Sequence, residues 1–297
     1  MMEYTANFMS CDSVPDAWAH EREAEGWHVL GCADHLWSGT RPFPHVWVTL
    51  TAIACATTRP LVTTSFANNL LRSPVEFAQA SLQLQCVSGG RFEAGLGAGW
   101  ASDEIEGIGE DYPPPGVRAG RFCEAIQITR ALFNDGSCSF HGVHYDIEVP
   151  KLGPRPALAP LLVASVGGDR TIREISPLVD RVELKPIASA TASGALDVAK
   201  LGLIGREHLV RQIDKVRVVA PDVPLAVFII CSAGVDKRSQ AVADLLEGTW
   251  FGGFFGEPAK VAESLQRLGE IGIERVQVSP FGDDSFPALA EHLPLRY

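Results

Sequence analysis

The chain has 297 residues, of which 46% are hydrophobic and 21% charged, and its formal net charge is −11 at pH 7. This composition is ordinary for a globular protein, and the acidic balance argues against nucleic acid or an anionic membrane as the main partner. No apolar stretch approaches the roughly 20 residues that span a bilayer, and the N-terminus lacks the basic and apolar segments of a secretory signal.

The seven cysteines are scattered along the chain, odd in number, and include no Cys-x-x-Cys pair. They therefore indicate neither a disulfide framework nor a zinc site. Most of them lie in apolar segments, where a free cysteine behaves as a small buried hydrophobe. We accordingly expect no bound metal and a reducing, cytoplasmic location.

Strand and helix patterns alternate along the first hundred residues. The β-branched and apolar runs predict strands at 4–9, 28–33, 61–66 and 91–97. A helix is expected after each of the first three strands, and proline or serine stands near two of the helix starts. These helices are predicted from a Ser13 cap to Glu25, from His45 to Thr58, and from Ser73 to Ser88.

The same alternation continues to the C-terminus. Strands are predicted at 160–165, 181–186, 225–230 and 275–280, and an exposed hairpin at 138–149. Residues 100–117, which contain three consecutive prolines, are expected to form a loop, as is the irregular segment 187–204. Helices are predicted at 118–133, after Gly168, at 206–219, 239–247 and 260–269, and near the chain end.

Eight strands in β/α order predict an α/β fold, specifically a (β/α)8 TIM barrel with loop insertions, in one domain over residues 1–297. The strands are near-continuous apolar runs, as expected for a parallel sheet buried on both faces. An open doubly wound sheet is the alternative. A strand very near each end of the chain favours the closed barrel.

The segment "GRFEAGLGAGW" at 90–100 contains the most concentrated glycines in the chain. It follows the fourth strand instead of the first, and Trp100 stands where a dinucleotide motif requires its third glycine. It also lacks the lysine of a phosphate loop. At the C-terminal end of a barrel strand, Gly97 and Gly99 instead leave room for a flat ligand beside the backbone, or simply make a tight strand exit.

Other polar residues follow strands at the same predicted face. Asp34 and His35 end the second strand, and histidine is the side chain most easily poised for proton transfer near neutral pH. Gly167 and Gly168 open the helix after the fifth strand, where backbone N–H groups favour an anion. Each feature alone is equally compatible with a structural role.

Four stretches together carry a resemblance to a known family. They are "GWHVLGCADHLW", "LVTTSFANNLLRSPVEFAQ", "SGGRFEAGLGAGWASDE" and "LLVASVGGDRTIRE". In this order they resemble the luciferase-like flavin and deazaflavin oxidoreductases, most closely the short branch that uses coenzyme F420. The resemblance covers residues 20–175 well, while the C-terminal third fits only by its β/α pattern.

The resemblance implies a bacterial luciferase-like barrel that holds a reduced deazaflavin, or FMN as the alternative, in its mouth. A cis peptide after the third strand, at Ser65–Phe66 or one position later, would support the central ring. His35 would lie next to the reactive carbon with Asp34 beside it. The ring edge and the cofactor phosphate would be bound by two further groups of residues: Gly97, Ala98 and Gly99, and Gly167, Gly168, Asp169 and Arg170.

The sequence departs from the sugar-phosphate dehydrogenases of this branch at two positions. Gly39 stands where they have a tryptophan, and Trp100 where they have a glutamate. The acid that they use for substrate oxidation is therefore absent, which argues against a glucose 6-phosphate dehydrogenase. Trp37 and Trp100, with Phe43, predict an aromatic lid over a flatter and less polar substrate.

Together these features predict an F420-dependent oxidoreductase that transfers hydride between the deazaflavin and a small organic substrate. We expect reduction of an activated C=C or C=N bond, with His35 handling the proton. An FMN-dependent monooxygenase of the same family and a flavin-binding barrel without catalysis are the alternatives. The resemblance also implies a homodimer.

Overall fold

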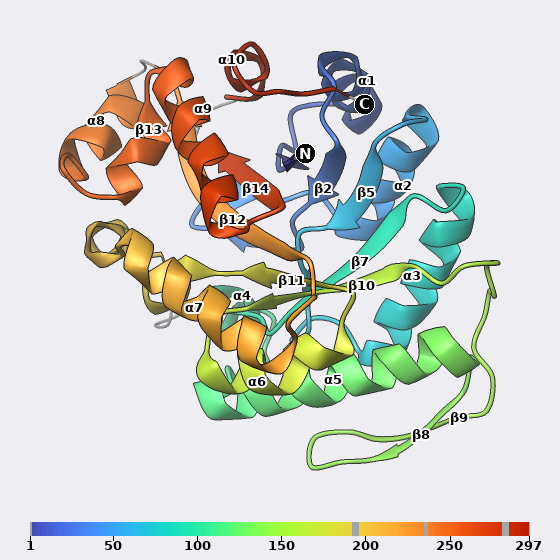
Figure 1. Cartoon of the computed structure of the whole chain (residues 1–297). Helices are drawn as coiled ribbons and strands as arrows, with labels where there is room; N and C mark the ends of the chain where they lie inside the picture. The colour runs from blue at the N-terminus through green and yellow to red at the C-terminus, as the bar shows by residue number, and fades with distance from the viewer. Residues whose placement is uncertain (1, 192–195, 235–236, 281–284, 297) are drawn as a thin grey trace.

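Eight parallel strands form a closed barrel at the centre of the computed structural model, which describes residues 2–191, 196–234, 237–280 and 285–296 (Figure 1). The barrel closes where the last strand pairs with the first, so that Glu3 lies opposite Arg275. The predicted (β/α)8 barrel is confirmed, and the doubly wound alternative is wrong. The barrel strands are β1 (Glu3–Phe8), β2 (Val29–Cys32), β5 (Leu61–Thr64), β7 (Phe92–Gly97), β10 (Leu161–Val166), β11 (Arg181–Leu184), β12 (Leu225–Ala233) and β14 (Arg275–Pro280).

Helices cover the outside of the barrel (Figure 1). The Ser73 side chain accepts a hydrogen bond from the Glu76 N–H and so caps α3, while Pro74 fits the first turn, where no N–H is needed. The outer helices are α1 (Pro15–Glu25), α2 (Val46–Ala56), α3 (Pro74–Val87), α5 (Pro115–Asp135), α6 (Asp169–Ile175), α7 (Arg206–Val219), α9 (Pro258–Gln266) and α10 (Phe286–Ala290).

Several insertions lie between the strands and helices of the barrel. The predicted surface hairpin is confirmed as β8 (Cys138–His141) and β9 (Asp146–Val149), which pair antiparallel. Residues 100–117 are not entirely loop, because they contain the short helix α4 (Ser102–Gly107). The remaining small elements are β3 (Trp37–Ser38), β4 (Arg41–Pro42), β6 (Ala67–Asn68), α8 (Lys237–Leu245) and β13 (Phe255–Gly256).

Several predicted boundaries differ from the structure. Ser13 does not cap α1, since Val14 occupies the N-cap position and supplies no side-chain hydrogen bond. Helix α5 begins at Pro115 instead of Arg118, because proline is tolerated in a first helical turn. The segment 187–204 contains the 3-10 helices Pro186–Ser189 and Val198–Leu203, and residues 192–195 lie outside the described residues.

The inside of the barrel is more polar than the sequence analysis expected. On β1, β11 and β14 every second residue is polar, and residues at the upper ends of these rows line the central cavity. The expectation of apolar strands is therefore wrong for the inward faces of these three strands. The inward rows are Glu3, Thr5 and Asn7; Arg181, Glu183 and Lys185; and Arg275, Gln277 and Ser279.

An ion network occupies the barrel end from which the strands start. Arg275 makes a bidentate pair with Glu93, and both side chains are almost fully buried. The Nε of Arg275 also donates to Glu3 at 2.8 Å, and Arg181 lies 3.6 Å from the same carboxylate. Such a paired cluster can replace the branched apolar residues that usually fill a barrel, because every buried charge has a partner of opposite sign.

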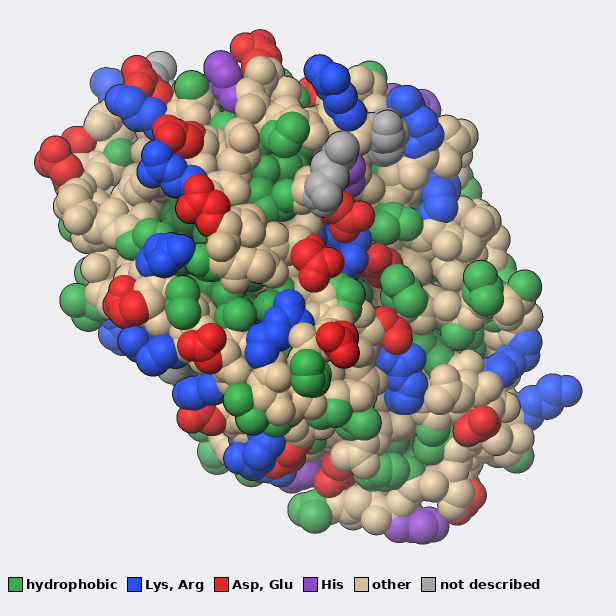
Figure 2. All heavy atoms as spheres, viewed as in Figure 1, with side chains coloured by type: hydrophobic (Ala, Val, Ile, Leu, Met, Phe, Trp, Pro, Cys, Tyr) green, Lys and Arg blue, Asp and Glu red, His purple; other side chains and the backbone are tan. Residues whose placement is uncertain are grey.

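The surface carries mixed charge. Figure 2 shows acidic and basic side chains interspersed over the face viewed in Figure 1, with no continuous area of one sign among the residues described. Within the same residues, no helix has the length and hydropathy that crossing a bilayer requires. No cluster of three or more His, Cys, Asp or Glu side chains among them could hold a metal ion.

Candidate active site

A cavity of about 810 Å³ opens at the C-terminal ends of the barrel strands. This volume lies within the usual range for a small-molecule site, and the position is where barrel enzymes place their chemistry. Most of the predicted site residues line it. They are Asp34, His35, Ser65, Phe66, Gly97, Ala98, Gly99, Trp100, Gly167 and Gly168.

His35 and Glu104 form a pair at the cavity wall. The fully buried Glu104 on α4 binds His35 Nδ1 through Oε1 and accepts the Leu36 N–H through Oε2 at 3.1 Å. Both carboxylate oxygens are thus used to hold the end of β2, which fixes the imidazole ring. Because Nδ1 is occupied, Nε2 is the ring nitrogen that can meet a ligand.

Asp34 has a different environment from His35. Its carboxylate accepts the Asn68 N–H at 2.9 Å and makes two hydrogen bonds with the Arg72 guanidinium, at 3.0 and 3.2 Å. Asp34 is 3% exposed. A carboxylate used in this way links β2 to the turn after β6 and holds the wall of the cavity in place.

Two aromatic rings flank His35. The Trp100 and Phe43 ring centroids lie 5.4 and 5.3 Å from that of the imidazole, and both residues line the cavity. Trp37 does not, because its ring packs against Gly107 of α4, where a Cβ would overlap it. The predicted aromatic lid therefore consists of Trp100 and Phe43, and the placement of Trp37 over the cavity is wrong.

The glycines of β7 and of the loop after it have different steric environments. A Cβ at Gly95 would overlap the Phe66 ring, and a Cβ at Gly99, where φ is +80°, would overlap Asn68. Only Gly97 faces open cavity without such a conflict. The cis peptide bond that the resemblance placed at Ser65–Phe66 is present at that position.

The junction of β10 and α6 contributes mainly backbone atoms to the cavity wall. Gly167 and Gly168, with Thr171, line the cavity. Asp169 and Arg170 do not: Asp169 pairs with Lys215 at 2.6 Å, and Arg170 donates to Glu174 at 3.2 Å. A cofactor contact from these two positions would therefore have to come from their backbone.

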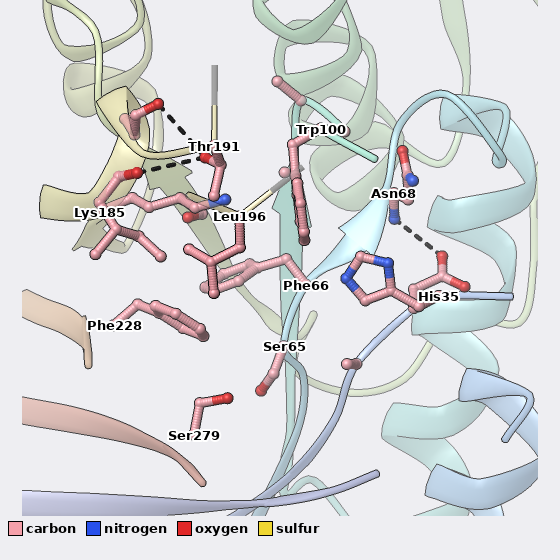
Figure 3. Close-up of a pocket in the computed structure, with 18 of the residues that line it drawn as sticks. His35, Ser65, Phe66, Asn68, Trp100, Lys185, Thr191, Leu196, Phe228 and Ser279 are labelled. Carbon is pink, nitrogen blue, oxygen red and sulfur yellow. Dashed lines mark hydrogen bonds between the residues drawn. The ribbon is translucent and has the colours of Figure 1, made fainter. Parts of the chain in front are cut away.

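Lys185 and Glu183 project inward from β11 at successive levels. Lys185 lines the cavity, with its Nζ 5.2 Å from the Trp100 ring centroid (Figure 3). Burial lowers the pKa of Lys185 to about 8 and raises the pKa of Glu183, one level deeper, to about 8. Burial thus disfavours the charged form of both side chains, and each opposite charge partly offsets that effect on the other.

Glu104 is a candidate site residue to which the sequence analysis gave no role. It is the last residue of the stretch "SGGRFEAGLGAGWASDE". Its signal in the sequence is an acidic side chain four residues after the "GLGAGW" exit, on a segment read as loop. Once α4 is seen as a helix, Glu104 and Ile105 are its buried residues.

The sequence profile of the luciferase-like monooxygenases matches residues 16–190, which is more than half of the chain. The barrel, the cavity at its strand ends and the Ser65–Phe66 cis peptide are in keeping with this match. The chain belongs to the luciferase-like monooxygenase family.

Curated relatives match about half of this chain. An F420-dependent glucose-6-phosphate dehydrogenase of Beutenbergia cavernae is 33% identical over 156 residues, 50% of this chain and 46% of the relative. One of Kineococcus radiotolerans is 29% identical over 156 residues, covering 50% and 45%. The uncharacterized protein Rv0953c of Mycobacterium tuberculosis is 28% identical over 136 residues, covering 45% and 47%. The chain thus matches about half the length of these relatives.

Solved structures share the whole fold. An F420-dependent secondary alcohol dehydrogenase, in complex with an F420-acetone adduct, superimposes with a TM-score of 0.76 at 17% identity, covering 100% of this chain and 99% of that one. The F420-dependent tetrahydromethanopterin reductase of Methanopyrus kandleri gives 0.70 at 14% identity, covering 98% of each. Identities this low bear on the fold alone.

Proposed function

We propose that this protein is an F420-dependent oxidoreductase that moves hydride between the deazaflavin and a small organic substrate. The observation that carries the proposal is the His35–Glu104 pair, which presents one ring nitrogen to a cavity of about 810 Å³. The F420-dependent enzymes among its relatives support the choice of cofactor.

The cavity residues fit a flat ring cofactor. Gly97 leaves open space beside the strand, Phe66 offers an apolar face, and buried Ser65 has a hydroxyl without a partner among the described residues. We expect Ser65, Phe66, Gly97, Ala98 and Gly99 to hold the ring. Gly167 and Gly168, with the backbone of Asp169 and Arg170, would hold the phosphate.

Reduced F420 supplies the hydride when it is bound, and the chain supplies the proton and the geometry. Glu104 holds the imidazole through Nδ1 so that His35 Nε2 gives a proton to the substrate, or takes one in the reverse direction. Asp34 keeps the neighbouring wall in position through Arg72 and Asn68. Trp100 and Phe43 exclude water from the proton-transfer path.

The walls favour a flat, weakly polar substrate. Phe228 and Leu196 lie on the side of the cavity away from His35 (Figure 3), and Ile187 and Ile230 add to its apolar lining. We propose reduction of an activated C=C or C=N bond. Neither an FMN-dependent monooxygenase nor a flavin-binding barrel without catalysis is favoured by a particular residue of this site.

A cofactor titration tests this proposal. Apo-protein titrated with F420 and, separately, with FMN should show saturable tryptophan quenching at least about tenfold tighter for F420, since Trp100 lines the site and one or two site-specific hydrogen bonds account for a factor of this size. Reduced F420 bound to the protein should then be oxidised by an electron-poor alkene or imine. Tighter FMN binding would instead identify a flavin enzyme, and bound F420H2 that no acceptor oxidises would indicate a binding protein.

We further propose a cytoplasmic homodimer in which the exposed face of α2 is covered. Helix α2 has no charged residue, and Val48 on its outer face is 70% exposed. The exposed residues of this helix, Val48, Thr51 and Cys55, are all uncharged, which favours association over this face. Light scattering should give twice the chain mass of 32.0 kDa, and Val48→Asp should give the monomer mass; a monomeric wild type would refute the dimer.

A further inference from the structure

Two buried oxygen atoms at the foot of the cavity have no hydrogen-bond partner among the described residues. They are Asn7 Oδ1 on β1 and Ser65 Oγ after β5. Asn7 is 3% exposed and Ser65 8%, and both line the cavity. Buried polar atoms in folded proteins are nearly always hydrogen-bonded, and these two, unlike most unpaired atoms of the chain, face a cavity that can admit a partner.

Local contacts fix the direction of both groups. The Asn7 amide nitrogen donates to the Val278 carbonyl at 3.4 Å, which leaves Oδ1 as the free end. The Ser65 backbone N–H donates to the Cys32 carbonyl at 2.9 Å, and this hydrogen bond holds the Ser65 backbone, from which the side chain extends, in place. In Figure 3 the Ser65 side chain points into the lower part of the cavity, toward the side where Ser279 lies.

Gly31 on β2 lets these two oxygens approach its backbone closely. A Cβ at this position would overlap both Asn7 Oδ1 and Ser65 Oγ, so the two atoms face the same small volume. Gly31 has no positive φ, and no turn requires it there. Its missing side chain is therefore explained by the close approach of the two oxygens to this part of β2.

We propose that Asn7 and Ser65 form a subsite for a lactam edge, meaning an N–H group next to a carbonyl. Asn7 Oδ1 can only accept and so takes the N–H, while the Ser65 hydroxyl donates to the carbonyl. The inference rests on the proposed function, because it places this edge at the foot of the same cavity. Two sources offer this chemistry: the pyrimidine-dione end of the deazaflavin ring, and a lactam or amide in the substrate.

The cofactor arm of the test compares 5-deazariboflavin with its N3-methyl derivative, which lacks the N–H. The wild-type apo-protein should bind the N–H form about tenfold tighter or more, since a ligand without the donor leaves Asn7 Oδ1 unsatisfied. Ser65→Ala should weaken binding of the N–H form several-fold, and Asn7→Leu should bind both forms equally. Gly116→Ala, where an added Cβ meets nothing, is the matched control and should keep the wild-type preference.

The substrate arm uses protein saturated with F420 and compares δ-valerolactam with its N-methyl derivative by calorimetry. If the N–H preference appears only in this arm and disappears in Asn7→Leu, the subsite binds the substrate. If neither arm shows a preference in the wild type, the two oxygens hold only water and the proposal is overturned.

A stability readout separates a binding role from a structural one. Ser65→Ala removes a hydroxyl that has no hydrogen-bond partner among the described residues, so the apo-protein should melt at or above the wild-type temperature while ligand binding weakens. A lower melting temperature of Ser65→Ala with unchanged ligand binding would overturn the assignment of Ser65. This readout does not depend on whether the Asn7→Leu variant folds. If the protein does not bind F420 at all, the proposed function is refuted. If it binds F420 but does not discriminate between the two deazariboflavins, only the deazaflavin ring is refuted as the ligand of the Asn7–Ser65 subsite.

Discussion

Replacing His35 with alanine should lower the rate of substrate reduction by about 10²–10⁴-fold, the range that a positioned general acid contributes. The affinity for F420 should change by less than about twofold, a small effect on the free-energy scale of one hydrogen bond, because the proposed function assigns the imidazole to the substrate and not to cofactor binding. Stopped-flow oxidation of bound F420H2 by an electron-poor alkene or imine measures the first quantity, and fluorescence titration the second.

Glu104→Gln is the variant that separates chemistry from ring placement. Glutamine keeps the size of the side chain but replaces one carboxylate oxygen with an amide, which cannot both accept from His35 Nδ1 and accept the Leu36 N–H. We expect a smaller loss than in His35→Ala, together with a changed pH profile of the rate. Full activity in His35→Ala would refute its role as the proton donor.

Replacing Arg275 with methionine should destabilise the fold by about 3–5 kcal/mol, the usual cost of removing one partner from a buried ion pair. The reason is that Glu93 is 2% exposed, and Arg275 is its ion-pair partner among the described residues. Chemical denaturation of the apo-protein measures the change in the free energy of unfolding.

Two control variants test whether the loss of stability comes from the unpaired buried charge. The double variant Glu93→Gln with Arg275→Met should recover much of the loss, because the uncompensated buried charge is gone. Arg267→Met removes one partner of an exposed pair with Glu263 and should cost less than about 1 kcal/mol. An Arg275→Met variant as stable as Arg267→Met would mean that the ion network does not hold the barrel end.

The barrel could be predicted from the sequence because its signals are local. Apolar strand segments, helix caps such as Ser73 and the number of β/α units are all visible within short windows. The polar barrel interior was also visible, as alternation in "EYTANF", "RVELKP" and "RVQVSP", but a parallel strand buried on both faces is expected to be apolar throughout. Charges that pair across the barrel, such as Glu93 with Arg275, are separated by 182 positions and leave no local pattern.

The site was predicted in part for the same reason. Residues at strand ends, such as His35 and Gly97, follow from the barrel and from motif resemblance. The His35–Glu104 contact joins residues 69 positions apart, through a helix hidden in a segment with three consecutive prolines. Trp37 was misplaced because a short hairpin and Gly107 turn its ring onto α4, and neither feature has a distinct sequence signal.

The crystal structure of the protein with bound F420 tests the central claim most directly. We expect the deazaflavin ring to lie against Ser65–Phe66 and Gly97, with its hydride-bearing carbon facing His35 Nε2 across a gap that one substrate group can fill. A ring bound elsewhere, or bound with that carbon turned away from His35, would contradict the account.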